Sequence, residues 1–263
     1  MSAPRRAAIA AAFGCLVLLA AAAGAAGLDF ALPDGVAAVD VPRLDANAHG
    51  TAAEVYDAGV AGAVVGLRRA IHEKPGIMYD EYEASRIVTE TLLAMGIPAS
   101  NIETGIALTG VIAHLGAGTL ASSKAGEGGV PTIALRADMD ALPIHEETDV
   151  PFKSTVPGVM HACGHDTHTA MLLGAAKLLK PFEERLKAEG KAVRFAFQPG
   201  EEGGAGGKRM IDEGLLEGAH AAFALHTKST SPTGLIIGKE GGCRRAPPVP
   251  DTARIVGRDA RRD

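Results

Sequence analysis

The chain has 263 residues, of which 47% are hydrophobic and 22% are charged, so it is long enough to bury one large core or two small ones. Its net charge of -5, its aromatic content of 4% and its lack of tryptophan argue against nucleic-acid binding by bulk charge or base stacking. The three cysteines, Cys15, Cys163 and Cys243, are too few for a disulfide-stapled scaffold. We therefore expect a globular protein with no nucleic-acid partner.

Residues 1–27 have the pattern of a secretory signal peptide. Arg5 and Arg6 precede an apolar run from Ile9 to Ala23, and the small residues around it are candidates for cleavage. The alternative is an uncleaved membrane anchor, but the run is shorter than the roughly 20 residues that a span needs. We therefore expect cleavage, no stable membrane span in the mature chain, and a location outside the cell or in the endomembrane lumen.

Helix and strand patterns alternate after a loose lead-in that extends to about residue 60. Helices are predicted over Tyr56–Ala70 and Glu81–Met95, with Gly96 as a C-terminal cap. Residues 116–130, rich in Gly, Ser and Ala, are expected to form a hairpin loop or an insertion. The other predicted elements are strands at Gly110–Leu115 and Pro131–Ala137, a helix at His168–Leu179, a strand at Lys191–Gln198, a short helix at Gly206–Glu213 and a buried strand at Ala221–Leu225. This alternation predicts an α/β fold with a mostly parallel sheet flanked by helices.

The densest group of metal-binding side chains lies between residues 159 and 171. It places Cys163, His165, Asp166 and His168 within six residues, with His161 just before them. Thiolate, imidazole and carboxylate groups are the ligands of Zn²⁺ and similar divalent ions. A lone histidine is usually a core residue, but this density favours a metal site.

Further acids and a histidine follow the predicted strands. Asp138 and Asp140 come after one strand, Glu201 and Glu202 after the next, and His226 after the last. Ligands of open α/β sheets gather beyond the carboxyl ends of the strands. We therefore expect these side chains to meet the cysteine and histidines at that edge.

The two acidic pairs have different alternative interpretations. Asp138 and Asp140 point to the same side of an extended segment, where one could bind metal or orient a ligand histidine. An Asx-turn before Pro143 is an equally good interpretation. In the pair Glu201 and Glu202, one carboxylate can bind metal while the other takes a proton from water. A solvated acidic turn is the commoner meaning of a bare Glu-Glu pair, but the neighbouring motifs favour the functional one. The glycines after this pair lack the spacing of a phosphate-binding loop.

Five blocks of the sequence together resemble the M20 metallopeptidase family in its amidohydrolase branch. This branch includes plant auxin–amino-acid conjugate hydrolases, hippurate hydrolases and related N-acyl-amino-acid hydrolases. The order and spacing of the blocks make the resemblance specific, and it covers roughly residues 56 to 240. The blocks are Arg69-Ala-Ile-His-Glu-Lys-Pro75, Ala134-Leu-Arg-Ala-Asp-Met-Asp-Ala-Leu-Pro-Ile144, His161-Ala-Cys-Gly-His-Asp-Thr-His168, Phe197-Gln-Pro-Gly-Glu-Glu-Gly203 and Ala224-Leu-His226.

The resemblance implies a reaction and a set of residue roles. The substrate would be a small N-acyl amino acid, such as an auxin conjugate, whose amide bond is cleaved by metal-activated water. The site would hold two divalent metal ions, Mn²⁺ or Zn²⁺, on the ligands Cys163, His165, Glu202 and His226. The implied catalytic side chains are Glu201, as general base, and Asp140, as supporting acid. Side chains expected to support the ligands without binding metal are Asp138, Asp166 and His168.

The sequence departs from the family after Lys239. Family members continue into a lid or dimerisation domain and return with a last histidine ligand, whereas residues 241–263 are rich in Arg and Pro and have no helix or strand period. We therefore expect residues 28–240 to be an incomplete catalytic domain without its lid, followed by a disordered tail. Gly200, where the branch commonly has Ala, is a minor departure.

Two alternatives to the amidohydrolase remain open. The first is a catalytically impaired fragment that binds metal, and the second is a peptidase or deacetylase of the same family. The sequence predicts neither the oligomeric state nor the acyl group of the substrate.

Overall fold

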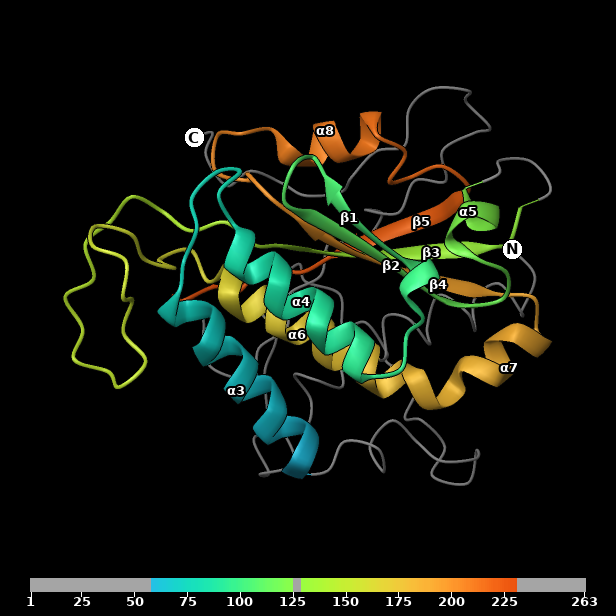
Figure 1. The fold of residues 1–263 in the computed structure, drawn as a ribbon, viewed down its shortest axis with the longest axis horizontal. Helices are drawn as coiled ribbons and strands as arrows, with labels where there is room; N and C mark the ends of the chain where they lie inside the picture. Colours follow the sequence, from blue (N-terminus) through green and yellow to red (C-terminus); the bar gives the residue numbers. More distant parts are fainter. Residues whose placement is uncertain (1–57, 125–128, 231–263) are drawn as a thin grey trace, which may run out of the picture.

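The computed structural model describes residues 58–124 and 129–230 as a five-stranded sheet with helices on both faces (Figure 1). Helices α3, α4, α6 and α7 lie on one side of the sheet and α8 on the other. The elements are α3 (Ala58–Glu73), α4 (Tyr82–Ala94), η2 (Ala99–Asn101), β1 (Ile102–Ile106), β2 (Gly110–Gly116), α5 (Leu120–Ser123), β3 (Thr132–Asp138), α6 (His165–Leu179), η3 (Lys180–Phe182), α7 (Glu183–Ala188), β4 (Ala192–Gln198), α8 (Gly206–Asp212) and β5 (Ala219–Ala224).

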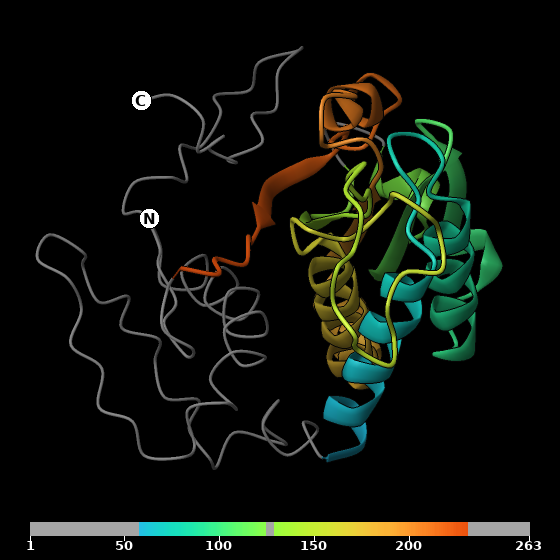
Figure 2. The same cartoon turned by 90° about the vertical axis from the view of Figure 1, so that its left-hand side faces the viewer.

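The strands are arranged in the order β1-β2-β4-β3-β5. β3 runs parallel to both β4 and β5, with Leu135 opposite Phe195 on one side and Phe223 on the other. β2 is antiparallel to both of its neighbours, β1 and β4. Figure 2 shows β5 at the far side of the sheet from β1. The three parallel strands therefore bring their carboxyl ends to one edge, where ligands of such sheets bind.

The prediction of an α/β fold with a helix-flanked sheet is confirmed, but the expected mostly parallel sheet is corrected to a mixed one. Strand β1 was not predicted, and it turns directly into β2 through Ala107 and Leu108, which have φ angles of 47° and 76°. So short a turn can join only antiparallel strands. Residues 116–130 are not a hairpin loop, because β4 lies between β2 and β3. They contain α5, and residues 125–128 lie outside the described part.

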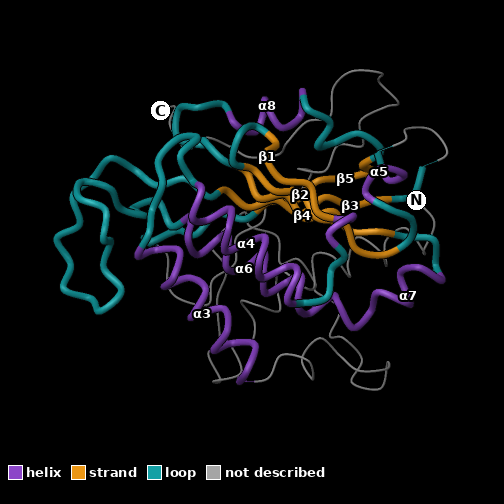
Figure 3. The backbone as a smooth tube through the Cα atoms, viewed as in Figure 1, coloured by secondary structure: helices purple, strands orange, loops and turns teal. Residues whose placement is uncertain are grey.

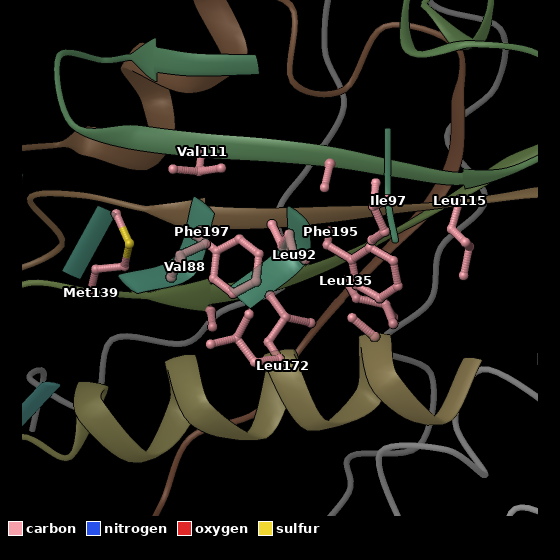
Figure 4. Packing of buried hydrophobic residues seen from close by; sticks show 14 of the residues in the cluster. Val88, Leu92, Ile97, Val111, Leu115, Leu135, Met139, Leu172, Phe195 and Phe197 are labelled. Carbon is pink, nitrogen blue, oxygen red and sulfur yellow. The ribbon is translucent and has the colours of Figure 1, made fainter. Parts of the chain in front are cut away.

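A hydrophobic cluster fills the space between the sheet and α4 and α6. Phe195 and Phe197 of β4 both face this cluster, since residues two apart in a strand share a face, and Leu172 of α6 packs against them (Figure 4). Ala196 faces the opposite cluster, together with Met210 of α8. Strand β4 is buried along its whole length because it is central in the sheet and covered on both faces.

Helix α4 closely matches the predicted helix and its predicted end. Gly96 has a φ of +80°, and its N–H donates to the carbonyl of Leu93 at 2.9 Å. The N–H of Ile97 reaches the carbonyl of Leu92 at 3.2 Å, which completes a glycine-terminated helix cap. Helix α3 ends three residues later than predicted, at Glu73, two residues before Pro75.

Helix α6 begins at His165, three residues before its predicted start. Gly164 precedes it with a φ of +91°, and a β-carbon there would lie 2.5 Å from the Thr227 hydroxyl oxygen. An amphipathic surface helix would expose one side, but α6 is packed against α3, α4 and the sheet. Lys177 is exposed, whereas most other residues of the helix are buried.

Strand β5 is half-buried rather than buried as predicted. Among the described residues it pairs with β3 alone, so one of its edges has no strand beside it there. Figure 3 shows a long loop of residues 139–164, between β3 and α6, that leaves the sheet at its carboxyl edge.

Several predictions lie outside the described residues and stay predictions. These are the signal peptide of residues 1–27, the lead-in up to residue 57, the domain boundary at residue 240 and the tail of residues 241–263. In the described part of the chain, none of the helices combines the length and the apolar character needed to cross a membrane.

Candidate metal centre

The predicted ligands meet at the carboxyl edge of the parallel strands. Asp138 ends β3, Glu201 and Glu202 follow β4, and His226 follows β5. Cys163 and His165 join them from the start of α6. In the part of the chain that the structure describes, three groups have ligand atoms within 4.8 Å of one another: Cys163, His165 and His226; Asp138, His165 and His168; and His165, Glu201 and Glu202.

His165 is the side chain that all three groups share. It is fully buried, and its Nδ1 donates to the backbone carbonyl of Asp140 at 2.9 Å and lies 3.1 Å from the carboxylate of the same residue. Its other nitrogen, Nε2, is buried and has no hydrogen-bond partner among the described residues. Nε2 lies 3.7 Å from an oxygen of Asp138 and 4.0 Å from one of Glu201. A histidine fixed at one nitrogen and unpartnered at the other is the usual arrangement of a metal ligand.

Burial by itself lowers the pKa of His165, but the neighbouring carboxylates have the larger effect. The hydrogen bond to Asp140 and the negative charges of Asp138 and Glu201 raise the pKa of His165. Without a cation at Nε2, a proton there is stabilised by these carboxylates. A divalent ion in the same place would take over that role.

Cys163 and His226 lie on the open side of the cluster. The Cys163 sulfur is 3.5 Å from Nε2 of His226, which is exposed, and Nδ1 of His226 donates to the carbonyl of Thr227 at 2.6 Å. Burial and the nearby carboxylate of Glu202 raise the pKa of the Cys163 thiol to about 12. The thiol is therefore protonated near neutral pH unless a cation displaces the proton.

Asp138 and His168 form a pair behind His165. Nδ1 of His168 donates to Asp138 at 2.6 Å, and Nε2 of His168 accepts the backbone N–H of Thr227 at 2.9 Å. Because both nitrogens are used, His168 fits the predicted supporting role rather than that of a ligand. Burial works against ionisation of Asp138, but this hydrogen bond and Arg136, 2.8 Å away, hold its pKa below the usual range.

Asp140 connects His165 to the loop with the two glutamates. One of its oxygens faces His165, and the other accepts the backbone N–H of Glu202 at 2.8 Å. Asp138 and Asp140 thus both approach His165, in line with the interpretation that one of them orients a ligand histidine. The Glu201 side chain is 42% exposed, and burial together with the charges of Asp138 and Glu202 raises its pKa. A carboxylate with a raised pKa is the better proton acceptor.

Asp166 turns away from the ligands and belongs to a second cluster. Its Oδ2 accepts a hydrogen bond from Nδ1 of His72 at 2.8 Å and forms an ion pair with Nε of Arg68 at 2.6 Å. Nε2 of His72 lies 3.2 Å from Glu146, whose other oxygen accepts the backbone N–H of Ser154 at 2.7 Å. The prediction that Asp166 supports the metal ligands is therefore corrected: its contacts join α3 and the 139–164 loop to α6.

His161 is the remaining histidine of the motif. It is buried beside His72, with the ring centroids 6.1 Å apart, and neither ring nitrogen has a hydrogen-bond partner among the described residues. Burial lowers its pKa to about 4, so the ring is neutral. It lies outside the three groups of ligand atoms.

The donor atoms fit a divalent metal ion. A thiol, two imidazoles and carboxylates converge, and Nε2 of His165, a residue common to all three groups, is buried without a partner. The sequence analysis assigned no role to three residues that contribute to these clusters: Thr227, His72 and Glu146. His72 lies in one of the quoted blocks, whereas Thr227 and Glu146 carry no sequence signal.

Comparisons with known proteins agree with this geometry. The sequence model of peptidase family M20/M25/M40 matches residues 134–242. The chain is 47% identical over 178 residues to an Arabidopsis thaliana protein named IAA-amino acid hydrolase ILR1-like 5, covering 68% of this chain and 37% of that one. It is 44% identical over 195 residues to thermostable carboxypeptidase 1 of Saccharolobus solfataricus, covering 73% of this chain and 45% of the relative. The chain thus spans less than half the length of these relatives.

A solved structure is similar in both sequence and fold. The crystal structure of the Bacillus subtilis YXEP protein, described as a dinuclear metal-binding peptidase from the M20 family, superposes with a TM-score of 0.57 at 40% identity. The match covers 67% of this chain and 45% of that one. Fold, motif order and sequence similarity together show that the chain belongs to the M20 family of peptidases.

Proposed function

We propose that this chain is the metal-binding catalytic part of a hydrolase that cleaves the amide bond between an acyl group and an amino acid. The observation that carries the proposal is the placement of Glu201. Its carboxylate is partly exposed beside Glu202 and 4.0 Å from the buried, unpartnered nitrogen of His165. A proton acceptor at the rim of a set of metal ligands is the arrangement that metal-assisted amide hydrolysis needs.

Each side chain has a separate task in this proposal. Cys163, His165, Glu202 and His226 would hold two divalent ions, Zn²⁺ or Mn²⁺. Bound there, the ions would polarise the amide carbonyl and make water a better nucleophile. Glu201 takes the proton from the water and returns one to the leaving amine, since its raised pKa suits both steps. Asp140 acts as a positioning residue, because it touches His165 and the Glu202 backbone rather than the open side.

The substrate class follows from the relatives. One is named a hydrolase of IAA–amino acids and another a carboxypeptidase. The bond common to both is an amide whose amine side is an amino acid. We therefore propose N-acyl amino acids as substrates, and the carboxypeptidase name makes short peptides the second candidate.

The test is hydrolysis by the full chain loaded with Zn²⁺ or Mn²⁺. Benzoyl, acetyl and indole-acetyl amino acids and a set of dipeptides are assayed by the release of free amino acid. Glu201→Gln is expected to lower kcat by about 10²- to 10⁴-fold while the variant still binds metal. Glu90→Gln, an exposed glutamate on α4, is the matched control and should leave kcat unchanged. Equal turnover by Glu201→Gln and the parent protein would overturn the role of Glu201, and preference for dipeptides would favour the peptidase.

A further inference from the structure

Glu81 is a buried carboxylate outside the candidate metal centre. It directly precedes α4 and has no solvent exposure, yet its side chain does not cap the helix. Among the described residues, no cation forms an ion pair with it. Burying a carboxylate without a counter-ion is costly, and burial raises the pKa of Glu81. An apolar side chain would avoid this cost, so the hydrogen bonds of the carboxylate need an explanation.

The carboxylate of Glu81 accepts hydrogen bonds from three separate segments. Oε1 accepts the backbone N–H of Tyr79 at 3.0 Å and that of Gly200 at 2.9 Å. Oε2 accepts the hydroxyl of Thr109, in the turn between β1 and β2. The contact that matters for the site is the one to Gly200, because the next residue in the chain is Glu201.

The loop around Glu201 is held at both flanking peptide groups. Gly200 donates its N–H to Glu81, and Glu202 donates its N–H to Asp140 at 2.8 Å. Gly200 has a φ of +56°, and its carbonyl accepts the N–H of Gly206 at 3.0 Å, which closes the loop. Two buried carboxylates therefore fix the backbone on either side of the proposed base.

The aromatic ring of Tyr79 supports the same loop. A β-carbon at Gly200 would lie 3.2 Å from this ring, and the Tyr79 hydroxyl donates to the carbonyl of Gly204. Tyr79 itself has a φ of +69°, which is unusual for a residue other than glycine. The hydrogen bond from its N–H to Glu81 stabilises that conformation. The segment from Tyr79 to Glu81 thus contacts the loop at two places.

We propose that Glu81 is a positioning residue that sets the backbone of Gly200 and thereby the places of Glu201 and Glu202. The proposal rests on the proposed function of those two glutamates. In this role the Glu81 carboxylate accepts a hydrogen bond from Gly200, so a neutral side chain of the same shape that also accepts this bond should be able to replace Glu81. Glu81 lies 119 residues before Gly200 in the chain, which explains why its role is not visible in the local motif.

The test compares three variants of the full chain. Glu81→Ala removes the acceptor, and kcat is expected to fall roughly 10- to 100-fold with KM changed less than about threefold. In Glu81→Gln, the amide oxygen can face Tyr79 and Gly200, and the NH₂ group can donate to the Thr109 hydroxyl, which can rotate to accept. The kcat of Glu81→Gln should therefore lie within about threefold of the parent value. Thr109→Val is the matched control: it removes a contact of the same carboxylate on the side away from Gly200 and should leave kcat unchanged.

A second measurement does not depend on turnover. Hydrogen exchange of the Gly200 amide, followed by NMR, should accelerate at least about 10-fold in Glu81→Ala and remain slow in Thr109→Val. Binding of Zn²⁺ should weaken about 10-fold or more in Glu81→Ala, because Glu202 lies on the same loop. If the parent protein hydrolyses none of the substrates, the proposed function fails, while these two readouts still decide the role of Glu81.

Two results would overturn the proposal. One is a slowly exchanging Gly200 amide and an unchanged kcat in Glu81→Ala. The other is an equal loss of kcat in Glu81→Ala and Thr109→Val, because that would indicate a merely structural contribution. If Glu81→Ala does not fold, Glu81→Asp takes its place. This variant keeps the charge but draws it back from Gly200, so faster exchange of the Gly200 amide supports the proposal and an unchanged rate overturns it.

Discussion

Two buried clusters of histidine and carboxylate lie on either side of the first turn of α6, and their central histidines, His165 and His72, differ in how the ring nitrogens are paired. The cluster around His165 contains a buried nitrogen, Nε2, without a partner. In the cluster around Asp166, both ring nitrogens of His72 are paired, one with Asp166 and one with Glu146. His165 and Asp166 are adjacent in the chain, yet they belong to different clusters.

This difference shows that one turn of α6 contributes adjacent residues to two separate clusters. Consecutive residues of an α-helix point about 100° apart, so His165 faces the carboxyl edge of the sheet while Asp166 faces α3 and the 139–164 loop. Buried polar groups are normally paired, and an unpaired one requires an explanation. The unpaired nitrogen of His165 suits a metal ligand, whereas the His72 ring, paired at both nitrogens, suits a structural contact.

The largest effect is expected on metal affinity, when a proposed ligand of the cluster around His165 is replaced. Cys163→Ser replaces the proposed thiolate ligand and should weaken Zn²⁺ binding by at least about 100-fold, because a hydroxyl is a poor ligand for this ion. The metal-free protein should keep its melting temperature to within about 2 °C, since the Cys163 side chain is half-buried and makes a long contact of 3.5 Å to His226. Titration calorimetry and thermal melts give both values. An unchanged affinity would remove Cys163 from the ligand set.

A smaller effect is expected on stability when the paired cluster is broken. Glu146→Gln places an amide donor against the N–H of Ser154 or of His72, so the free energy of unfolding at pH 7 should fall by about 1–3 kcal/mol. Zn²⁺ affinity should stay the same, which makes this variant the counterpart of Cys163→Ser. Urea unfolding measures the change. Loss of metal binding in Glu146→Gln would show that the two clusters are not independent.

The pH dependence of the same variant sharpens this prediction. Burial opposes the charge of Glu146, but its hydrogen bonds to Thr148, Ser154 and His72 lower its pKa from 4.5 to about 2. A lowered folded-state pKa contributes stability that is present above pH 4.5 and is lost as the pH falls toward 2. The parent protein should therefore lose more stability than Glu146→Gln between those pH values. Parallel curves for the two proteins would contradict the assignment.

The smallest effect is expected at the rim of the paired cluster. Arg68→Met removes an ion pair with Asp166 and a guanidinium 5.0 Å from the ring of Phe152, but the Arg68 side chain is 32% exposed. Solvent screening limits the loss of unfolding free energy to about 1 kcal/mol or less. Zn²⁺ affinity should not change. If urea unfolding shows that Arg68→Met loses more unfolding free energy than Glu146→Gln, the contact of Arg68 contributes more to stability than that of Glu146, contrary to this prediction.

Local patterns in the sequence were sufficient to predict several helices and strands and most residues of the candidate metal centre. The helical spacing and Gly96 predicted α4 and its end, and the strand expected at Lys191–Gln198 matches β4. The Cys-Gly-His motif and the acids after β3 and β4 predicted which side chains meet at the sheet edge. These features were predictable because each depends on residues close together in the chain.

The residues themselves determined the chemistry of this protein: thiol, imidazole and carboxylate groups at the ends of strands, in the order of one family. The tertiary structure alone decided the strand order, the place of β1 and β2, the pairing of Asp166 with His72, and the contact of Glu81 with Gly200. The last two pairs are separated by 94 and 119 residues. Such contacts exist only once the sheet and helices have packed, because their partners carry no periodic signal that marks them for one another.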